Sequence, residues 1–328
     1  MKEMETIGLI GDIGATHARL GRVVSDNALD FKESITDIRI FRCKEFETIE
    51  DLISYYLALV DSLEHPGRGV IAIAAPVDGD HVYMPNLGWQ FSQIRVTENL
   101  GFNTLVFVND FEAQAHGIRK FTAKDRVQVG PGEPVKRFPI AVLGPGSGLG
   151  MAGIIPSGNQ MTILSSEGGH AGYSPGDEME VAIFRFLMET YGRISNERLL
   201  SGQGIENLYK AVLHIHDVKR KPLAAYEITA NAISDQCFFC RKSLDLFCAI
   251  LGSVAGDIAL IMGAKGGVYL TGGIVPRFLD FLKRSEFRNR FEDKGRFSGY
   301  LNQIPTYVVT AEEPGLLGAK VIFDGQNA

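Results

Sequence analysis

The stretch Leu105-Val106-Phe107-Val108-Asn109-Asp110 decides how the rest of the chain is interpreted. Its four apolar residues, three of them β-branched or aromatic, predict a short strand that is covered on both faces. Two polar side chains follow at once. Because open α/β sheets bind ligands beside the carboxyl ends of their strands, Asn109 and Asp110 are candidates for a binding or catalytic role.

Asp110 also has a purely structural interpretation. The residues from Phe111 to Lys120 have a helical pattern, and Asp is a favoured residue where a helix begins. Taken alone, Asn109-Asp110 therefore favours a strand-to-helix turn over a catalytic site. The choice between the two depends on the rest of the chain.

The size and composition are typical of a globular protein with two domains. The chain has 328 residues, of which 45% are hydrophobic and 22% are charged, and this length suffices for two domains of ordinary size. The net charge of −6 disfavours nucleic acid or an anionic membrane as the main partner. ATP is compatible with this charge, because local groups bind it.

No targeting or membrane segment is expected. The first residues, Met1–Thr6, carry acids, and the apolar stretch after them has only the length of a strand. The most apolar region is uncharged only from Leu246 to Gly256, whereas a membrane span needs about 20 residues.

The four cysteines are Cys43, Cys237, Cys240 and Cys248. Cys237 and Cys240 have C-x-x-C spacing, but they lie in an apolar, helix-like stretch without a second pair or a nearby His. Core packing of reduced thiols is favoured over metal or redox use. A reducing cytoplasm fits this usage.

A glycine turn between two strands occurs near the start of the chain. Apolar Thr6–Ile10 leads into Gly11-Asp12-Ile13-Gly14-Ala15-Thr16-His17, and Ala18–Val24 returns. Glycines let a backbone approach a phosphate closely with its N–H groups exposed. Thr16 adds a hydroxyl donor, and Asp12 can hold Mg²⁺ through water. A plain Gly-Asp hairpin turn is the structural alternative.

The same design returns more than a hundred residues later. Ile140–Leu143 predicts a strand, Gly144-Pro145-Gly146-Ser147-Gly148-Leu149-Gly150 a turn, and Met151–Ile155 the return strand. This repeat suggests a duplicated phosphate-binding hairpin, one in each domain, with a nucleotide between them. The chain contains neither a Walker loop nor a Rossmann fingerprint. A further strand, Gly267–Leu270, precedes Gly272-Gly273, where glycines again mark a contact between ligand and backbone.

Candidate binding side chains lie outside the periodic segments. Glu167 and His170 flank two glycines and can hydrogen-bond hydroxyl groups such as those of a sugar; ordinary loop residues are the alternative. Glu197 is either a first-turn carboxylate favoured by a helix dipole or a further ligand contact. Asn86, near the only Trp of the chain, can reach a sugar hydroxyl.

Helical periodicity predicts two long helices and leaves one long loop. Phe46–Leu63 is amphipathic, and Thr229–Met262 is periodic throughout, with Gly252 and Gly256 for close packing. Lys124–Phe138 is rich in Gly, Pro and charge, so it predicts a surface loop beside the domain hinge.

Seven motifs follow one another along nearly the whole chain, from about residue 6 to residue 320. They are Gly11-Asp-Ile-Gly-Ala-Thr16 with Arg19, Asn109-Asp110-Phe111, Gly144-Pro-Gly-Ser-Gly-Leu-Gly150, Glu167-Gly-Gly-His170, Leu200-Ser-Gly202, Leu270-Thr-Gly-Gly-Ile-Val-Pro-Arg277 and Phe291-Glu-Asp-Lys-Gly-Arg-Phe297. Each motif is weak by itself, but the ordered set resembles the bacterial glucokinase family, of the type with an actin-like ATPase fold.

The resemblance implies an α/β protein of the actin-like ATPase (ribonuclease H-like) fold, with two domains and a cleft between them. Residues 1–120 and 311–328 would form the small domain and residues 121–310 the large one. The family also implies a homodimer in the cytoplasm.

The resemblance assigns roles to the candidate residues. Asp110 would be the general base, and glucose would be bound by Asn109, Glu167, His170 and Glu197. Gly11–Thr16 and Gly146–Gly148 are similar to the two phosphate turns of the family, and Gly272–Gly273 is similar to its adenosine turn.

The chain departs from the family pattern at three positions. The family usually has Gly where Ala15 stands, Asn where His17 stands, and often Thr where Ser147 stands. A side chain at Ala15 opposes a positive φ, which would make the first phosphate turn tighter or weaken its hold on ATP. A related kinase group has a cysteine-rich zinc site after its E-G-G-H. No Cys lies between Cys43 and Cys237 here, so zinc at His170 is not expected.

The expected reaction is transfer of the γ-phosphoryl group of ATP, with Mg²⁺, to the 6-hydroxyl of D-glucose, the first step of glycolysis. Asp110 would accept the hydroxyl proton. A kinase for another hexose or an amino sugar is the alternative enzyme. A sugar-sensing repressor of this fold would need a basic helix-turn-helix domain before Gly8. A structural ATPase would not need the polar cluster.

Overall fold

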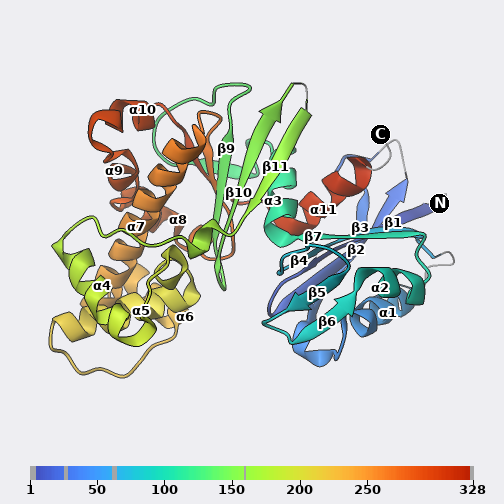
Figure 1. The fold of residues 1–328 in the computed structure, drawn as a ribbon, viewed down its shortest axis with the longest axis horizontal. Coiled ribbons are helices and arrows are strands. Elements are labelled where there is room, and N and C mark those ends of the chain that lie inside the picture. The colour runs from blue at the N-terminus through green and yellow to red at the C-terminus, as the bar shows by residue number, and fades with distance from the viewer. Residues whose placement is uncertain (1–4, 26–28, 61–64, 159, 326–328) are drawn as a thin grey trace. The chain divides into compact units, whose positions relative to one another are not determined.

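The computed structural model describes residues 5–25, 29–60, 65–158 and 160–325, and the chain divides into two compact units (Figure 1). Unit 1 comprises Met1–Phe121 together with Ala311–Ala328, and unit 2 is the continuous segment Thr122–Thr310. The chain therefore passes between the units twice. The predictions for residues 1–4 and 61–63 lie outside the described residues.

Unit 1 is built on a five-stranded mixed sheet with the order β3-β2-β1-β4-β7. The strands are β1 (Glu5–Ile13), β2 (His17–Ser25), β3 (Ile35–Arg42), β4 (Arg68–Ile73) and β7 (Thr104–Asn109). β1, β2 and β3 pair antiparallel, whereas β1, β4 and β7 pair parallel. The strand predicted at residues 105–109 is confirmed, and it lies at the edge of the sheet.

Alternate residues of these strands face opposite sides, and helices cover both. Leu9, Ile71 and Phe107 belong to the core on one side, which α1 (Ile49–Leu59), α2 (Gln93–Asn99) and the hairpin of β5 (His81–Met84) and β6 (Trp89–Ser92) complete. Their sequence neighbours Ile10, Val70 and Val108 face α3 (Asp110–Ile118) and α11 (Pro314–Gly325). Because successive side chains of a strand point to opposite faces of the sheet, each face of this sheet has its own hydrophobic core.

Helices α3 and α11 lie side by side in unit 1, although they are far apart in the sequence (Figure 1). A Cβ added at Gly318 would lie 1.8 Å from the Ala113 carbonyl oxygen, and one at Gly117 would lie 3.2 Å from that of Pro314. Glycine on both helices therefore allows their backbones to touch.

Unit 2 repeats the plan of unit 1. Its sheet has the order β11-β10-β9-β12-β13-β8, formed by β8 (Arg126–Gln128), β9 (Ile140–Pro145), β10 (Leu149–Ser157), β11 (Gln160–Ser166), β12 (Val268–Leu270) and β13 (Thr306–Val309). β9, β10 and β11 pair antiparallel, and β9, β12 and β13 pair parallel, as β1 to β7 do. The repeated strand–turn–strand design predicted from the glycines is thus confirmed.

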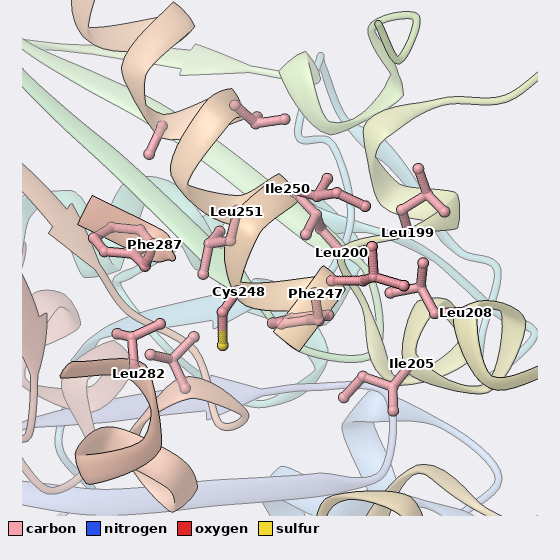
Figure 2. Close-up of a cluster of buried hydrophobic side chains, with 14 of the residues drawn as sticks. Leu199, Leu200, Ile205, Leu208, Phe247, Cys248, Ile250, Leu251, Leu282 and Phe287 are labelled. Carbon is pink, nitrogen blue, oxygen red and sulfur yellow. The ribbon is translucent and has the colours of Figure 1, made fainter. Parts of the chain in front are cut away.

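The core of unit 2 is organised around one long helix, α7 (Phe238–Met262) (Figure 2). The other helices are α4 (Glu178–Tyr191), α5 (Gly202–Ile215), α6 (Ala225–Ile233), α8 (Leu279–Arg284), α9 (Phe287–Glu292) and α10 (Ser298–Asn302). Phe247, Ile250 and Leu251 of α7 are fully buried. A Cβ at Gly252 would lie 2.0 Å from the Phe287 carbonyl oxygen, so the expected close packing at this glycine is confirmed.

Helix α7 is also the one helix in the described ranges that is long and apolar enough to cross a membrane by length and composition. Of its most apolar window, 67% is buried inside the protein. This burial is what a core helix requires, and the packing in Figure 2 accounts for the composition of α7.

Two helix predictions need correction. The helix predicted over residues 46–63 is shorter, because Thr48 and Asp51 form a capping box that starts α1 at Ile49. The periodicity over residues 229–262 covers two helices, not one. The chain breaks between α6 and α7, where Asp235 has a positive φ of 56° and Cys237 is the residue that caps α7.

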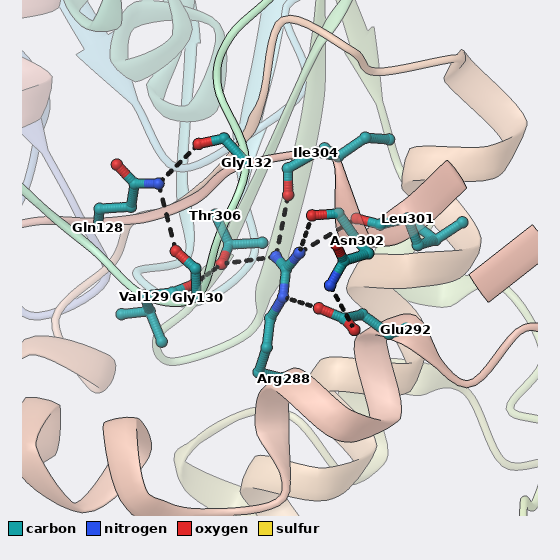
Figure 3. A network of polar contacts seen from close by, with 10 residues as sticks. All are labelled: Gln128, Val129, Gly130, Gly132, Arg288, Glu292, Leu301, Asn302, Ile304 and Thr306. Carbon is teal, nitrogen blue, oxygen red and sulfur yellow. Dashed lines mark hydrogen bonds and ion pairs between the residues drawn. The ribbon is translucent and has the colours of Figure 1, made fainter. Parts of the chain in front are cut away.

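The loop predicted at residues 124–138 contains the short strand β8 and is bound tightly to unit 2 (Figure 3). Thr306 donates a hydrogen bond to the Val129 carbonyl. Arg288 forms an ion pair with Glu292 and donates to the carbonyls of Leu301, Asn302 and Ile304 at 2.9–3.1 Å. The half-buried guanidinium thus satisfies several carbonyls of residues 301–304 at once. The predicted loop itself is held by its pairing with β13 and by the bonds between Val129 and Thr306.

Candidate functional site

Asn109 and Asp110 lie where three parallel strands of unit 1 end. Residue Ile13 of β1 is in register with Ile73 of β4, which is in register with Asn109 of β7. Asp110 is the first residue of α3 and is half-buried. The expected position at the carboxyl edge of the sheet is therefore observed.

The structural interpretation of this pair is confirmed as well. Asn109 caps α3: its Oδ1 accepts hydrogen bonds from the Phe111 and Glu112 backbone N–H groups at 2.9 and 3.2 Å. Its Nδ2 donates to the Ala75 carbonyl at 3.2 Å. Asp110 Oδ1 accepts from the Phe111 N–H at 2.9 Å. These bonds fix the orientation of both side chains, which is what a binding residue at this edge needs.

The first glycine turn is shorter than predicted. Strand β1 continues through Gly11, Asp12 and Ile13, and β2 begins at His17, so the turn is only residues 14–16. The Gly14 N–H donates to the His17 carbonyl at 3.0 Å, and the Cys43 N–H donates to the Thr16 carbonyl at 3.0 Å.

Ala15 fits the first turn without strain. It is not among the described residues with a positive φ. Because φ here lies in the region open to any residue, the expected conflict between a side chain and the turn does not arise. Ala15 is half-buried and Thr16 exposed.

Asp12 is held in a charged group within unit 1. In the β1–β2 register it pairs with Arg19, and Arg19 forms an ion pair with Glu313, the residue before α11. A Cβ on Gly315 would lie 2.4 Å from Asp12 Oδ2, so the first turn of α11 lies against this carboxylate. Burial raises the pKa of Asp12 to about 6, the positive charge of Arg19 lowers it, and Glu313 adds to the rise.

Arg19 and Glu313, which surround Asp12, were given no role from the sequence. Arg19 stood in the first motif, and its place opposite Asp12 follows from hairpin register. Glu313 comes almost three hundred residues later. No local pattern indicates its position, because the contact depends on the return of α11 to unit 1.

The second glycine turn, in unit 2, is fixed by Glu197. Between β9 and β10 the Gly146 N–H donates to the Gly148 carbonyl at 2.8 Å. The Leu149 N–H donates to Glu197 Oε2 at 2.9 Å. A Cβ at Gly148 would lie 2.5 Å from that oxygen, so glycine is needed for this approach. The Gly202 N–H, at the start of α5, donates to the Gly146 carbonyl at 2.9 Å. Ser147 is exposed.

Glu167, His170 and Glu197 form one cluster beside this turn. His170 Nε2 lies 3.9 Å from Glu167 Oε2, and His170 Nδ1 lies 3.9 Å from Glu197 Oε1. The side chain of Glu167 is 67% exposed, that of His170 61% and that of Glu197 30%. The cluster thus presents two carboxylates and an imidazole to solvent, a donor and acceptor set suited to hydroxyl groups.

The third glycine turn follows β12 in unit 2. Gly272 has a φ of +83°, and a Cβ there would lie 2.5 Å from the Pro145 carbonyl oxygen at the end of β9. Only glycine fits both conditions. Gly273 has no atom within 4 Å of its Cβ position, so this side of the turn is open.

A pocket of about 240 Å³ lies in unit 2 just after this turn. It is lined by Ile205, Ala225, Tyr226, Thr229, Ala230, Ile233, Ile274 and Arg277. Most of the lining is apolar, with one guanidinium and two hydroxyls, which suits a flat heterocycle with polar edges. The sequence did not indicate that residues of α6 line a pocket. The predicted helix began at Thr229, so Ala225 and Tyr226 of α6 lay outside it.

The described contacts join the predicted residues within each unit. In unit 1 they connect Asp12 with the end of the sheet that carries Asn109 and Asp110. In unit 2 they connect Gly146, Gly148, Glu167, His170 and Glu197. Asn86 is exposed in the turn between β5 and β6, and no contact found in the described ranges links it to the other candidates.

Among the described residues no group of three or more His, Cys, Asp or Glu side chains could hold a metal ion. A single carboxylate can still contribute to a magnesium site, because Mg²⁺ is commonly held by one or two carboxylates together with phosphates and water. Asp12 fits this use, since a cation would favour the charged form that burial opposes.

Comparisons with known proteins agree on one family. The family model described as Glucokinase matches residues 9–326. The glucokinase of Colwellia psychrerythraea is 43% identical over 323 residues, covering 97% of this chain and 96% of its own. The glucokinase of Campylobacter jejuni subsp. doylei is 43% identical over 319 residues, covering 96% of this chain and 93% of its own.

Solved structures agree with these sequence matches. The crystal structure of glucokinase from an Antarctic psychrotroph has a TM-score of 0.85 at 33% identity, and covers 97% of this chain and 98% of its own. A ROK family glucokinase from Streptomyces griseus, in complex with glucose and AMPPNP, has a TM-score of 0.64 at 19% identity. It covers 96% of this chain and 98% of its own, and at this identity it supports the fold alone.

Proposed function

The chain belongs to the glucokinase family, and we propose that it transfers the γ-phosphoryl group of ATP to the 6-hydroxyl of D-glucose. Its fold is the actin-like ATPase fold of that family. The product would be glucose 6-phosphate, so the reaction would be the first step of glycolysis. The observation that carries the proposal is the match to glucokinases at 43% identity over nearly the full chain.

Asp110 would act as the general base. Its support is its place at the carboxyl edge of the unit 1 sheet and the hydrogen bond that fixes its Oδ1 at the start of α3. A carboxylate in this position would accept the proton of the attacking hydroxyl, a contribution of about 10²–10⁴-fold.

Polar side chains would bind glucose. Asn109 would contribute from unit 1 with the amide that β7 and α3 orient, and we keep Asn86 as a further candidate. Glu167, His170 and Glu197 would contribute from unit 2, where they form one cluster. Sugar hydroxyls both donate and accept hydrogen bonds, so carboxylates, an imidazole and an amide together match them.

ATP would be bound by the three glycine turns. Backbone N–H groups of residues 11–16 and 146–148 would face its phosphates. Gly272 and Gly273 would face the adenosine, with the adenine in the pocket that Tyr226, Ile274 and Arg277 help to line. Asp12 would hold Mg²⁺ through water, and when bound with ATP the ion neutralises charge on the phosphate oxygens.

These parts would supply mainly orientation and charge stabilisation, on which phosphoryl transfer depends. The side chains around the sugar would bring its 6-hydroxyl to Asp110. The bonds of the Gly14 and Gly146 N–H groups would hold the turn backbone in place. The phosphates would then be bound by the other N–H groups of these turns, which would need little reordering.

A direct test replaces the base. Asp110→Asn should bind glucose in calorimetry but lose about 10²–10⁴-fold in kcat, because the amide cannot accept the proton. Glu178→Gln is a matched control, since it removes a first-turn carboxylate from α4. Near-normal kcat for Asp110→Asn would remove Asp110 from the mechanism.

The sugar and the donor need their own assay. Rates of coupled ADP production with glucose, mannose, fructose and N-acetylglucosamine, beside a reaction without sugar, would rank the acceptors. A faster rate with another sugar than with glucose would favour the alternative kinase.

The remaining expectations are a cytoplasmic location and a homodimer, without nucleic acid or membrane as partners. The four cysteines, which are all free thiols, are consistent with a reducing compartment. Light scattering of the purified protein would test the dimer.

A further inference from the structure

Two cysteines that the proposed reaction does not use lie together at the start of α7. Cys237 caps the helix from an extended conformation, with φ −142° and ψ 111°, and Cys240 is in its first turn. Cys237 is partly exposed, whereas Cys240 is fully buried. Both are free thiols. The pair therefore has one sulfur that solvent reaches and a second one behind it.

The surroundings of Cys237 favour its thiolate. The Cys240 backbone N–H donates to Cys237 Sγ at 3.4 Å, and Arg220 Nη1 donates to the same sulfur at 3.6 Å. Burial opposes ionisation, but hydrogen bonds from Cys240 and Phe239 and the charge of Arg220 lower the pKa of Cys237 overall. A helix N-terminus acts in the same direction.

Cys240 has the opposite properties. Burial, the hydrogen bond to Cys237 and the negative charge on Cys237 raise the pKa of Cys240 to about 12. A buried thiol of this kind does not react with reagents in solution, but it can attack a sulfur that is bonded to Cys237. One exposed nucleophile and one shielded thiol are the two parts that disulfide exchange needs.

We propose that Cys237 and Cys240 form a redox-active pair, which low-molecular-weight disulfides of the glutathione class oxidise to an intramolecular disulfide. This proposal goes beyond the expectation that both cysteines serve core packing. It is independent of the kinase chemistry, because neither cysteine belongs to the candidate site.

The oxidation takes place in two exchanges. The Cys237 thiolate attacks one sulfur of the small disulfide; that S–S bond breaks, and one small thiolate leaves. The Cys240 sulfur then attacks Cys237 Sγ and expels the second small thiolate, which takes up the Cys240 proton. Two protein thiols are oxidised and one small disulfide is reduced to two thiols.

The disulfide needs a small backbone shift at the start of α7. Residues three apart at a helix start have Cβ atoms about 5–6 Å apart, and a disulfide needs about 4 Å. Cys237 precedes the helical residues in an extended conformation, so a change in its backbone dihedral angles can bring the two Cβ atoms closer. Its Sγ already lies 3.4 Å from the Cys240 backbone nitrogen. The bond would close a ring over the first turn of α7.

Thiol counting tests the proposal on the full-length protein. After treatment with oxidised glutathione and removal of the reagent, free thiols measured in denaturant should fall from four to two in the unchanged protein. Cys240→Ser should keep a glutathione adduct on Cys237, visible in intact-mass spectra, because the second exchange is blocked. Cys237→Ser keeps a good helix cap and should retain all three of its thiols.

Alkylation by iodoacetamide gives a second readout. At about pH 6.5 Cys237 should be labelled faster than glutathione, and Arg220→Gln should slow that labelling. Cys43 and Cys248 are fully buried and serve as internal references. Four free thiols after oxidation of the unchanged protein, or no adduct in Cys240→Ser, would overturn the proposal.

Discussion

Glu197 contacts both the second glycine turn and His170. Its Oε2 accepts the Leu149 N–H of the second glycine turn, and its Oε1 lies 3.9 Å from His170 Nδ1. The sequence left two interpretations open, a helix-dipole carboxylate and a ligand contact. Neither interpretation includes the hydrogen bond from the Leu149 N–H, which lies 48 residues earlier in the chain. Such a contact depends on tertiary packing.

Removing this carboxylate should loosen the second turn. Glu197→Ala deletes a charged acceptor of a backbone N–H, a loss of about 1.5–3 kcal/mol. We therefore expect the KM for ATP to rise roughly ten- to hundredfold. Glu197→Gln keeps an oxygen acceptor and should change this KM less. Steady-state rates with ATP varied at saturating glucose would measure it, and an unchanged KM in Glu197→Ala would contradict the role of this turn.

Asp12 should make stability depend on pH. Its pKa in the folded protein is about 6, above the ordinary 3.8, so the protonated carboxyl favours the folded state. The resulting stabilisation is fully present below about pH 4 and is lost as the pH rises through about 6. Asp12→Asn stays neutral. The free energy of unfolding of the unchanged protein, relative to Asp12→Asn, should therefore fall between about pH 4 and about pH 7.

Urea unfolding in EDTA without nucleotide would measure this difference, since any cation at Asp12 would mask it. The comparison with Asp12→Asn removes the pH dependence of all other groups. A difference that stays constant across this range would show that Asp12 titrates normally.

At the scale of elements, the contact between α3 and α11 shows what sequence patterns omit. The glycines at 117 and 318 allow backbone contact, but hydrophobic periodicity does not predict which helix meets which. The N-terminal and C-terminal parts of unit 1 therefore join through a surface that the sequence does not mark.

Gly318→Ala should destabilise unit 1. The added methyl would lie 1.8 Å from the Ala113 carbonyl oxygen, so the two helices must move apart at a cost of about 1–3 kcal/mol. Gly325→Ala is the matched control in the same helix, because nothing lies within 4 Å of its Cβ position. Chemical denaturation would compare the two. Equal stability of both variants would mean that the helices separate without cost.

At the scale of the whole molecule, the repeated sheet was the feature that sequence reasoning predicted best. Two glycine turns between short apolar strands were visible in residues 11–17 and 144–150, since turn chemistry is local. The sequence did not predict the break between α6 and α7, because the helical spacing of apolar residues continues across the polar residues Ser234–Gln236. The candidate binding residues could be proposed from the sequence mainly where they belong to short glycine-rich or polar motifs. The positions of Glu313 and of the α6 residues that line the pocket depend on contacts between segments far apart in the sequence.

Unit 2 should fold without unit 1. It is a continuous segment with its own core, so residues 122–310 expressed alone should give a cooperative thermal transition. Residues 1–121 alone lack Leu316, Ala319 and Phe323 of α11, which complete one core of unit 1, and should lack such a transition. Circular dichroism and calorimetry would measure both, and an unfolded 122–310 fragment would contradict the independence of its core.

The return of α11 to unit 1 has a consequence for biosynthesis. A ribosome makes the sheet of unit 1 first, yet α11, one of the two helices that cover the same face of this sheet, is translated only after all of unit 2. While unit 2 emerges, Ile10, Val70 and Val108 can therefore be covered by α3 but still lack the apolar side chains of α11. Apolar surface that is exposed in such an interval is prone to aggregation.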